Sequence, residues 1–140
     1  MSNLFFNQIK VESGANAQLA HNMAIKRLCA HNKRHPREHQ EFNTPELINS
    51  FMPGSSSMFS ELTQSQLSCK SAYVDDRLMP GAVLKILSTD SPPYGLLEIY
   101  LMHLFKIDPK VIVSMYSYTC HSNEEWICNL IVQNGVICQI

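Results

Sequence analysis

The sequence predicts an α+β fold that is mainly helical and closes with a helix, a turn, a second helix and a β-hairpin. Three observations near the C-terminus predict it. Asp108 followed by Pro109 has the pattern of an N-cap and a first helical position, so a helix is expected to begin there. The apolar segment Tyr94–Phe105 has the length of a preceding helix. Asn134-Gly135 between two apolar runs predicts a hairpin turn.

This order of elements is that of a winged helix-turn-helix with three helices and a hairpin. We expect the helices over Ala82–Leu87, Tyr94–Phe105 and Pro109–Thr119, and the hairpin over Trp126–Ile140. The expected small core beneath the first of these helices consists of Leu101, Leu104, Ile112 and Tyr116.

A second interpretation of residues 111–119 remains open. This stretch is rich in β-branched and aromatic residues, and intrinsic propensity alone predicts a strand. The C-terminus would then be a three-stranded antiparallel meander turning near His121 and at Asn134-Gly135, and the winged helix would be absent. The Asp-Pro cap and the length of the turn favour the helix.

The N-terminal part begins with a short apolar segment, residues 1–11, that suits either a strand or a fraying helix. Ser13 is positioned to cap a helix over Gly14–Ala30. The periodicity of that helix predicts an apolar face that packs on the domain or serves dimerisation, formed by Leu19, Ala20, Met23, Ala24 and Leu28.

The middle of the chain contains turn and linker signals. His31–Gln40 is polar, basic and interrupted by proline, which predicts an exposed loop. Short helices are expected from Asn43 to Phe51 and over Met58–Leu67, separated by the connector Pro53–Ser57. We therefore expect two parts, an N-terminal helical extension with a basic loop over residues 1–57 and a winged-helix domain over residues 58–140.

Composition narrows the class of protein. The 140 residues are 45% apolar, which is enough for a buried core, and no apolar run reaches the length of a membrane span. The N-terminus lacks the basic and apolar regions of a secretory signal. The five scattered cysteines include no CxxC pair and do not indicate a disulfide framework. These features predict a cytoplasmic protein without a membrane anchor.

Residues 98–119, EIYLMHLFKIDPKVIVSMYSYT, resemble the helix-turn-helix of small bacterial transcription regulators. The stretch is most similar to the CaiF/GrlA family of activators, and the similarity covers roughly residues 79–140. The resemblance implies sequence-specific binding of double-stranded DNA through the last predicted helix. It also implies control by a protein partner, and self-association as a homodimer is an alternative form of control. No cofactor is expected.

If residues 109–119 are helical, their exposed side and the hairpin tip are the predicted DNA-contacting surface: Lys110, Ser114, Ser117, Tyr118, Gln133 and Asn134. This surface is poor in positive charge. Residues 1–43 carry six Lys or Arg against three acidic residues, whereas residues 44–140 carry five against nine. A basic arm is therefore expected to supply the phosphate contacts, consisting of Lys26, Arg27, Lys33, Arg34 and Arg37.

Three other functions compete with DNA binding. Val111 and Val113 on the exposed side would suit a protein interface, so the chain is alternatively a non-catalytic adaptor or inhibitor. A cysteine hydrolase would use Cys69 as nucleophile and His121 as base, although no residue is evident that would orient the imidazole. A zinc site is a weaker candidate because proline interrupts its helical spacing and no usual ligand pattern is present; its ligands would be Cys29, His31, His35 and His39.

Overall fold

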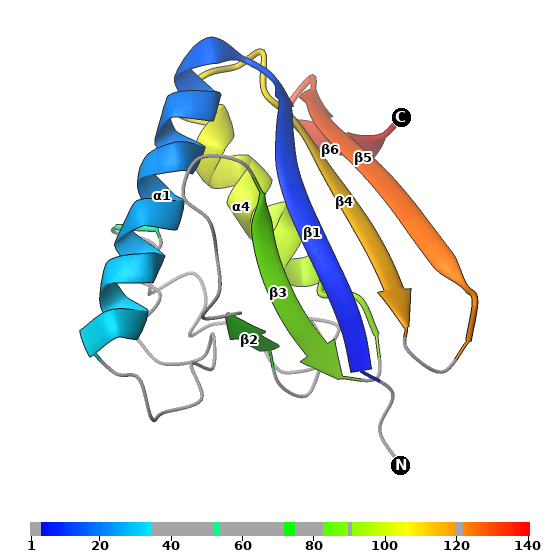
Figure 1. Ribbon diagram of the computed structural model, residues 1–140. Helices are drawn as coiled ribbons and strands as arrows, with labels where there is room; N and C mark the ends of the chain where they lie inside the picture. Colours follow the sequence, from blue (N-terminus) through cyan, green and yellow to red (C-terminus); the bar gives the residue numbers. More distant parts are fainter. Residues whose placement is uncertain (1–3, 35–51, 54–71, 75–82, 90, 120–121) are drawn as a thin grey trace.

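The computed structural model describes residues 4–34, 52–53, 72–74, 83–89, 91–119 and 122–140. Within these residues the chain forms six strands and two helices, shown in Figure 1. In chain order they are β1 (Leu4–Ser13), α1 (Ala15–Arg34), β2 (Ala72–Val74), β3 (Leu84–Thr89), α4 (Tyr94–Phe105), β4 (Ile112–Thr119), β5 (Glu125–Gln133) and β6 (Val136–Gln139).

The strands form one antiparallel sheet in the order β2-β3-β1-β4-β5-β6. The first strand of the chain is central, because β1 pairs with β3 on one side and with β4 on the other. The sequence boundary expected at residues 57 and 58 lies outside the described residues. The segment before it contributes β1 to the same sheet as the segment after it.

Both helices lie on the same side of this sheet (Figure 1), and the core fills the space between the two layers. Side chains in a strand alternate between the two faces, so every second residue of β1 points toward the helices. Ile9 of β1, Ile86 of β3 and Val113 of β4 are almost completely buried there. The helices contribute a larger set of buried side chains: Ala17, Ala24, Ile25 and Leu28 from α1, and Leu96, Leu97, Tyr100, Leu101 and Leu104 from α4.

The predicted mainly helical, winged helix-turn-helix fold is wrong. Residues 112–119, expected in a third helix, form β4, and residues 84–87, expected in a first helix, belong to β3. The alternative interpretation of residues 111–119 as a strand is the one observed. Strand β4 pairs along both edges, and Val113 and Met115 are buried in the core. Pairing on two sides and burial together outweigh a local capping signal.

Asp108 is a capping residue, but it caps a different helix from the one expected. Its carboxylate accepts a hydrogen bond of 3.1 Å from the backbone N–H of Asn16 in the first turn of α1, and another of 3.0 Å from the N–H of Lys110. The N–H of Val111 donates to the Asp108 carbonyl at 3.2 Å, which closes a turn with Pro109 at its second position. The cap predicted at Ser13 is therefore wrong, since Ser13 ends β1.

Several local predictions are confirmed. Helix α4 spans the predicted residues 94–105, and Asn134-Gly135 is the turn between β5 and β6. Both turn residues have positive φ, 53° and 77°, as a type I′ turn requires. The helix predicted to end at Ala30 continues through Arg34, so the loop does not begin at His31. The helices expected over residues 43–51 and 58–67 lie outside the described residues.

Candidate functional site

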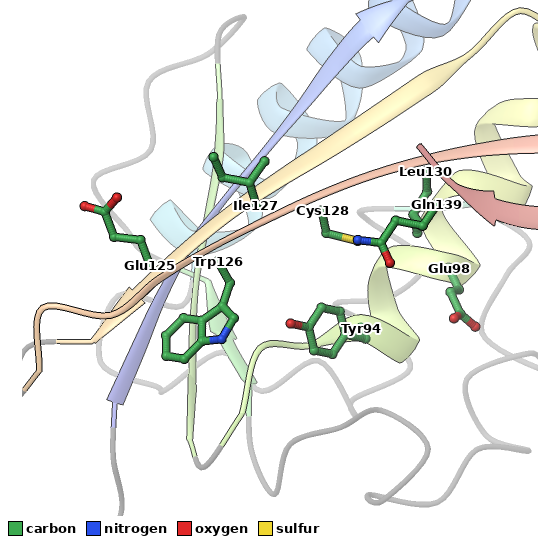
Figure 2. A pocket seen from close by; sticks show the side chains of 8 residues that line it. All are labelled: Tyr94, Glu98, Glu125, Trp126, Ile127, Cys128, Leu130 and Gln139. Carbon is green, nitrogen blue, oxygen red and sulfur yellow. The ribbon is translucent and has the colours of Figure 1, made fainter.

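A cleft lies between α4 and the end of the sheet formed by β5 and β6. It has a volume of about 530 Å³, and Figure 2 shows it between the first turns of α4 and strand β5. We call it the α4 cleft, and its lining residues are Tyr94, Glu98, Glu125, Trp126, Ile127, Cys128, Leu130 and Gln139.

The aromatic side chains of the α4 cleft come from two elements. Tyr94 starts α4 and Trp126 lies near the start of β5, and their side chains occupy the same side of β5 in Figure 2. The Trp126 ring packs against the Phe5 ring with centroids 5.3 Å apart, which anchors it to the central strand. Glu125 and Ile127 point to the other side of the sheet because strand residues alternate.

The thiol in the α4 cleft belongs to Cys128, which is 8% exposed. Burial, followed by the negative charge of Glu98, raises the pKa of this thiol above its usual value. A thiol whose pKa is raised stays protonated at neutral pH and is a poor nucleophile. The arrangement favours binding of a ligand over thiolate chemistry.

The side of the sheet that faces away from both helices is the second candidate surface. We call it the open face. Strand alternation and the pairing register place on it Leu4, Phe6, Gln8, Lys10, Glu12, Lys85, Leu87, Ile112, Ser114, Tyr116, Tyr118, Glu125, Ile127, Asn129 and Ile131. Leu4 is 40% exposed and Ile127 is 67% exposed, so large apolar side chains of this face meet solvent.

A band of aromatic rings crosses the middle of the open face. The rings of Phe6 and Tyr118 stack with centroids 5.2 Å apart, and the rings of Tyr116 and Tyr118 are 5.7 Å apart. A shallow hollow of about 170 Å³ lies beside Phe6, next to Lys85 and Leu87. A hydrogen bond with the Glu125 carboxylate raises the pKa of the Tyr116 hydroxyl, so the acidic side chain is directed across this face.

A buried pair of polar residues joins the two helices. The Nδ1 atom of His21 lies 2.5 Å from the hydroxyl of Tyr100, and both side chains are fully buried. Burial lowers the pKa of His21 to about 4 and raises the pKa of Tyr100 above its usual value. Neither residue lines the α4 cleft or the hollow on the open face, so the pair is in the wrong place to act on a bound substrate.

The residues predicted to contact DNA are distributed over different parts of the sheet. Ser114 and Tyr118 lie on the open face, where Ser114 donates a hydrogen bond of 2.7 Å to Glu12. Ser117 is buried on the helix side and donates to Asn7 at 2.7 Å. Lys110 is exposed in the turn before β4, and Gln133 and Asn134 are exposed at the turn between β5 and β6.

The assignment of faces within residues 111–119 is reversed relative to the sequence prediction. Val111 and Val113, expected at an exposed surface, are 2% and 0% exposed. Ile112 and Tyr116, expected in the core, are half-buried side chains of the open face. A strand inverts these assignments because the period of its side chains is two, whereas that of a helix is 3.6.

The expected basic arm belongs in part to α1. Lys26 and Arg34 are exposed, Arg27 is half-buried, and Lys33 lies in the last turn of the helix, whereas Arg37 lies outside the described residues. On the apolar face predicted for this helix, Ala24 and Leu28 are buried, but Leu19 and Met23 are 62% and 58% exposed. The periodicity identified the buried side only in part.

The proposed hydrolase residues Cys69 and His121 lie outside the described residues, as do His35 and His39 of the zinc candidate. Cys29 and His31 lie on α1, where His31 is buried. Within the described part of the chain, no group of three or more His, Cys, Asp or Glu side chains is arranged to hold a metal ion.

Sequence reasoning missed Phe6, Lys85 and Trp126 as functional candidates. Lys85 was expected in the helix over Ala82–Leu87, Phe6 in a segment left open between strand and helix, and Trp126 in a hairpin strand whose other neighbour was unknown. A pairing register is needed to bring such residues onto a surface. An alternating pattern over LFFNQIKVES was the available signal, since Phe5, Asn7, Ile9 and Val11 all point inward.

No helix in the described part of the chain is both long and apolar enough to cross a membrane. Comparison with known proteins gives no relative: no family model, no curated protein and no solved structure matches the chain. The similarity to the CaiF/GrlA family stays untested by these comparisons, and the winged helix that it implied is not the observed fold.

Proposed function

We propose that this chain is a non-catalytic protein-interaction domain and that it pairs with a second copy of itself through the open face. The observation that carries the proposal is the band of stacked aromatic rings, together with exposed Leu4 and Ile127, on the sheet face opposite to helices α1 and α4. An apolar patch of this kind marks an interaction site more often than it marks ordinary solvent-exposed surface.

The charges beside the aromatic band favour a second copy as the occupant. Lys85 lies on β3 at one flank, and Glu125 lies on β5 at the other. A two-fold symmetric interface brings the same patch of each protomer together, so it must be self-complementary. A patch with a base on one flank and an acid on the other, around an apolar middle, meets this requirement.

The sheet register gives the expected contacts. With a two-fold axis parallel to the strands and between β1 and β4, β3 of one protomer lies over β5 of its partner. Lys85 is in the row of Gln8, Tyr116 and Ile127, and Glu125 is in the next row. Neighbouring rows are about 7 Å apart along a strand, which a lysine side chain spans. Face-to-face sheet packing of this kind is common in sandwiches.

The test is a charge-reversal cycle followed by sedimentation velocity over a range of protein concentrations. We expect a concentration-dependent dimer, and we expect Lys85→Glu or Glu125→Lys alone to weaken it by at least about tenfold, because like charges then face each other. The double reversal should restore the dimer. Lys26→Glu, on the exposed side of α1, is the matched control and should leave it unchanged.

Two results would contradict the proposal: a monomer at every concentration, or a double reversal that dimerises no better than either single variant. DNA binding stays a prediction from the sequence. A duplex-DNA gel shift with salt titration tests it separately, because binding through phosphate contacts must weaken steeply as salt rises.

A further inference from the structure

The α4 cleft lies on the other side of the sheet from the open face, so an inference about it is independent of the proposed self-association. Its wall on one side is Tyr94 of α4, and its wall on the other is Trp126 of β5 (Figure 2). Leu130 and Cys128 continue the β5 side, and Gln139 of β6, which pairs with Leu130, also lines the cleft. The cleft is therefore bounded by two aromatic rings and apolar groups, with an amide at its edge.

The charge of the α4 cleft is negative. Glu98 lies one helical turn after Tyr94, and Figure 2 shows the Tyr94 ring between Trp126 and the Glu98 side chain. Its carboxylate is close enough to influence the Cys128 thiol. Among the described residues that line the cleft, none is basic, so no lining side chain neutralises this carboxylate.

Within the described part of the chain, the charged groups in the lining are the carboxylates of Glu98 and Glu125, and Glu125 is directed to the open face. A carboxylate beside aromatic rings is the combination that recognises positively charged nitrogen groups, through cation–π attraction and charge-assisted hydrogen bonds. The amide oxygen of Gln139 is an additional acceptor for an N–H group.

We infer that the α4 cleft binds an organic cation, an alkylammonium or guanidinium group whose charged end lies between Tyr94 and its counter-ion Glu98, with the alkyl chain extending along β5 toward Trp126. The same chemistry occurs in a free amine and in a lysine or arginine side chain of a peptide. The volume of about 530 Å³ holds an alkyl chain together with its charged end.

The chain has a single tryptophan, and it lies in this cleft, so its fluorescence reports binding directly. Titration with n-butylammonium or n-butylguanidinium should give a saturable change in Trp126 emission in the millimolar range. Neutral n-butanol should give no saturable change. Glu98→Gln should weaken binding of the cations by at least about tenfold. Glu124→Gln, an exposed acid outside the lining, is the matched control and should bind as the unmodified chain does.

Calorimetric titration of the same ligands gives a second measurement that does not depend on the fluorophore. A short peptide with one lysine, compared with its alanine counterpart and with the free amine, separates the two sources: tighter binding of the lysine peptide indicates a protein segment, and equal or weaker binding indicates a small molecule. The inference is overturned if neither method detects saturable cation binding, if butanol binds as well as butylammonium, or if Glu98→Gln binds as tightly as Glu124→Gln. Lys85→Glu should leave cation binding intact, so a failure here is distinct from a failure of self-association.

Discussion

Gly14 connects β1 to α1 at a point where both its conformation and its surroundings disfavour a side chain. Its φ is +96°, and a β-carbon built there would lie 3.0 Å from the Oδ2 atom of Asp108. That oxygen accepts the hydrogen bond from the Asn16 N–H at the start of α1. The absence of a side chain at residue 14 thus allows a residue 94 positions later to cap the helix.

The chain offers a matched pair of substitutions for this contact. Gly14→Ala and Gly135→Ala both place a β-carbon at positive φ, which costs roughly 1 kcal/mol at either site. At Gly135 nothing lies within 4 Å of the new atom. Gly14→Ala also displaces the capping carboxylate, so urea denaturation should show a further loss of about 1 kcal/mol. Equal losses at the two sites would mean that the Asp108 cap contributes little.

The pKa of the Asp108 carboxyl depends on a donor two residues away and on donors in the first turn of α1. The N–H of Lys110 is the main cause that lowers the pKa of this carboxyl from its ordinary value of 3.8, and the N–H groups of Asn16 and Ala17 lower it further. These donors favour the ionised form. The stability that they provide is present above the ordinary pKa and is lost as the pH falls through the lower value of the folded state.

At the scale of elements, a buried polar network ties the three central strands together. The Nδ2 group of Asn7 in β1 donates to the Ser88 hydroxyl at 2.9 Å and to the Ile86 carbonyl at 3.1 Å, both in β3. The Ser117 hydroxyl of β4 donates to the Asn7 Oδ1 atom at 2.7 Å. Ser88 in turn donates to the carbonyl of Ser91, just before α4. One amide therefore satisfies polar groups on both neighbouring strands.

Replacing that amide should be costly. Asn7→Leu leaves the Ser117 hydroxyl buried without its acceptor, and we expect a loss of about 1–3 kcal/mol in the free energy of unfolding, measured by urea denaturation. Gln8→Leu, on the adjacent open-face position, is the control and should change stability by less than about 0.5 kcal/mol. Adding Ser117→Ala to Asn7→Leu should recover part of the loss, since both partners are then removed. No recovery would show that packing, and not the network, sets the cost.

At the scale of the whole molecule, His21 makes the two-helix layer sensitive to acid. The imidazole is fully buried between α1 and α4, and its Nε2 atom has no hydrogen-bond partner among the described residues. Burial lowers its pKa from 6.5 to about 4. The unfolded chain therefore binds more protons than the folded chain between these two values, and stability falls as the pH is lowered through this window.

The expected loss from pH 6.5 to 4 is as much as about 3 kcal/mol, and urea denaturation at a series of pH values measures it. His21→Gln should have a flatter profile in this window, whatever its stability at neutral pH. His103, whose pKa burial also lowers, remains in both proteins, so the difference between the two profiles isolates His21. Parallel profiles would show that His21 does not titrate in the folded chain as described.

The sequence by itself determined those elements whose signals are local. Helix α4 and the Asn134-Gly135 turn follow from a continuous apolar segment and from two residues that tolerate positive φ, and the structure has both where they were predicted. The sequence also located most of α1. Neither the open face nor the α4 cleft could be predicted in this way. The open face combines strands that are far apart in the chain, and the cleft depends on how α4 packs beside β5 and β6.

Only the tertiary structure determined that residues 108–119 form a turn and a strand and not a helix. Their local signals conflicted, because the Asp-Pro pair indicated a helix start and the β-branched side chains indicated a strand. The structure contains both a cap and a strand, but the cap belongs to another helix. The Asp108 carboxylate caps α1, and Val113 and Met115 enter the core from β4. A cap needs only free N–H groups within reach, and a central strand needs partners on both sides. Residues distant in sequence supplied the N–H groups of α1 and the partner strands of β4, so local signals could not determine which structure would form.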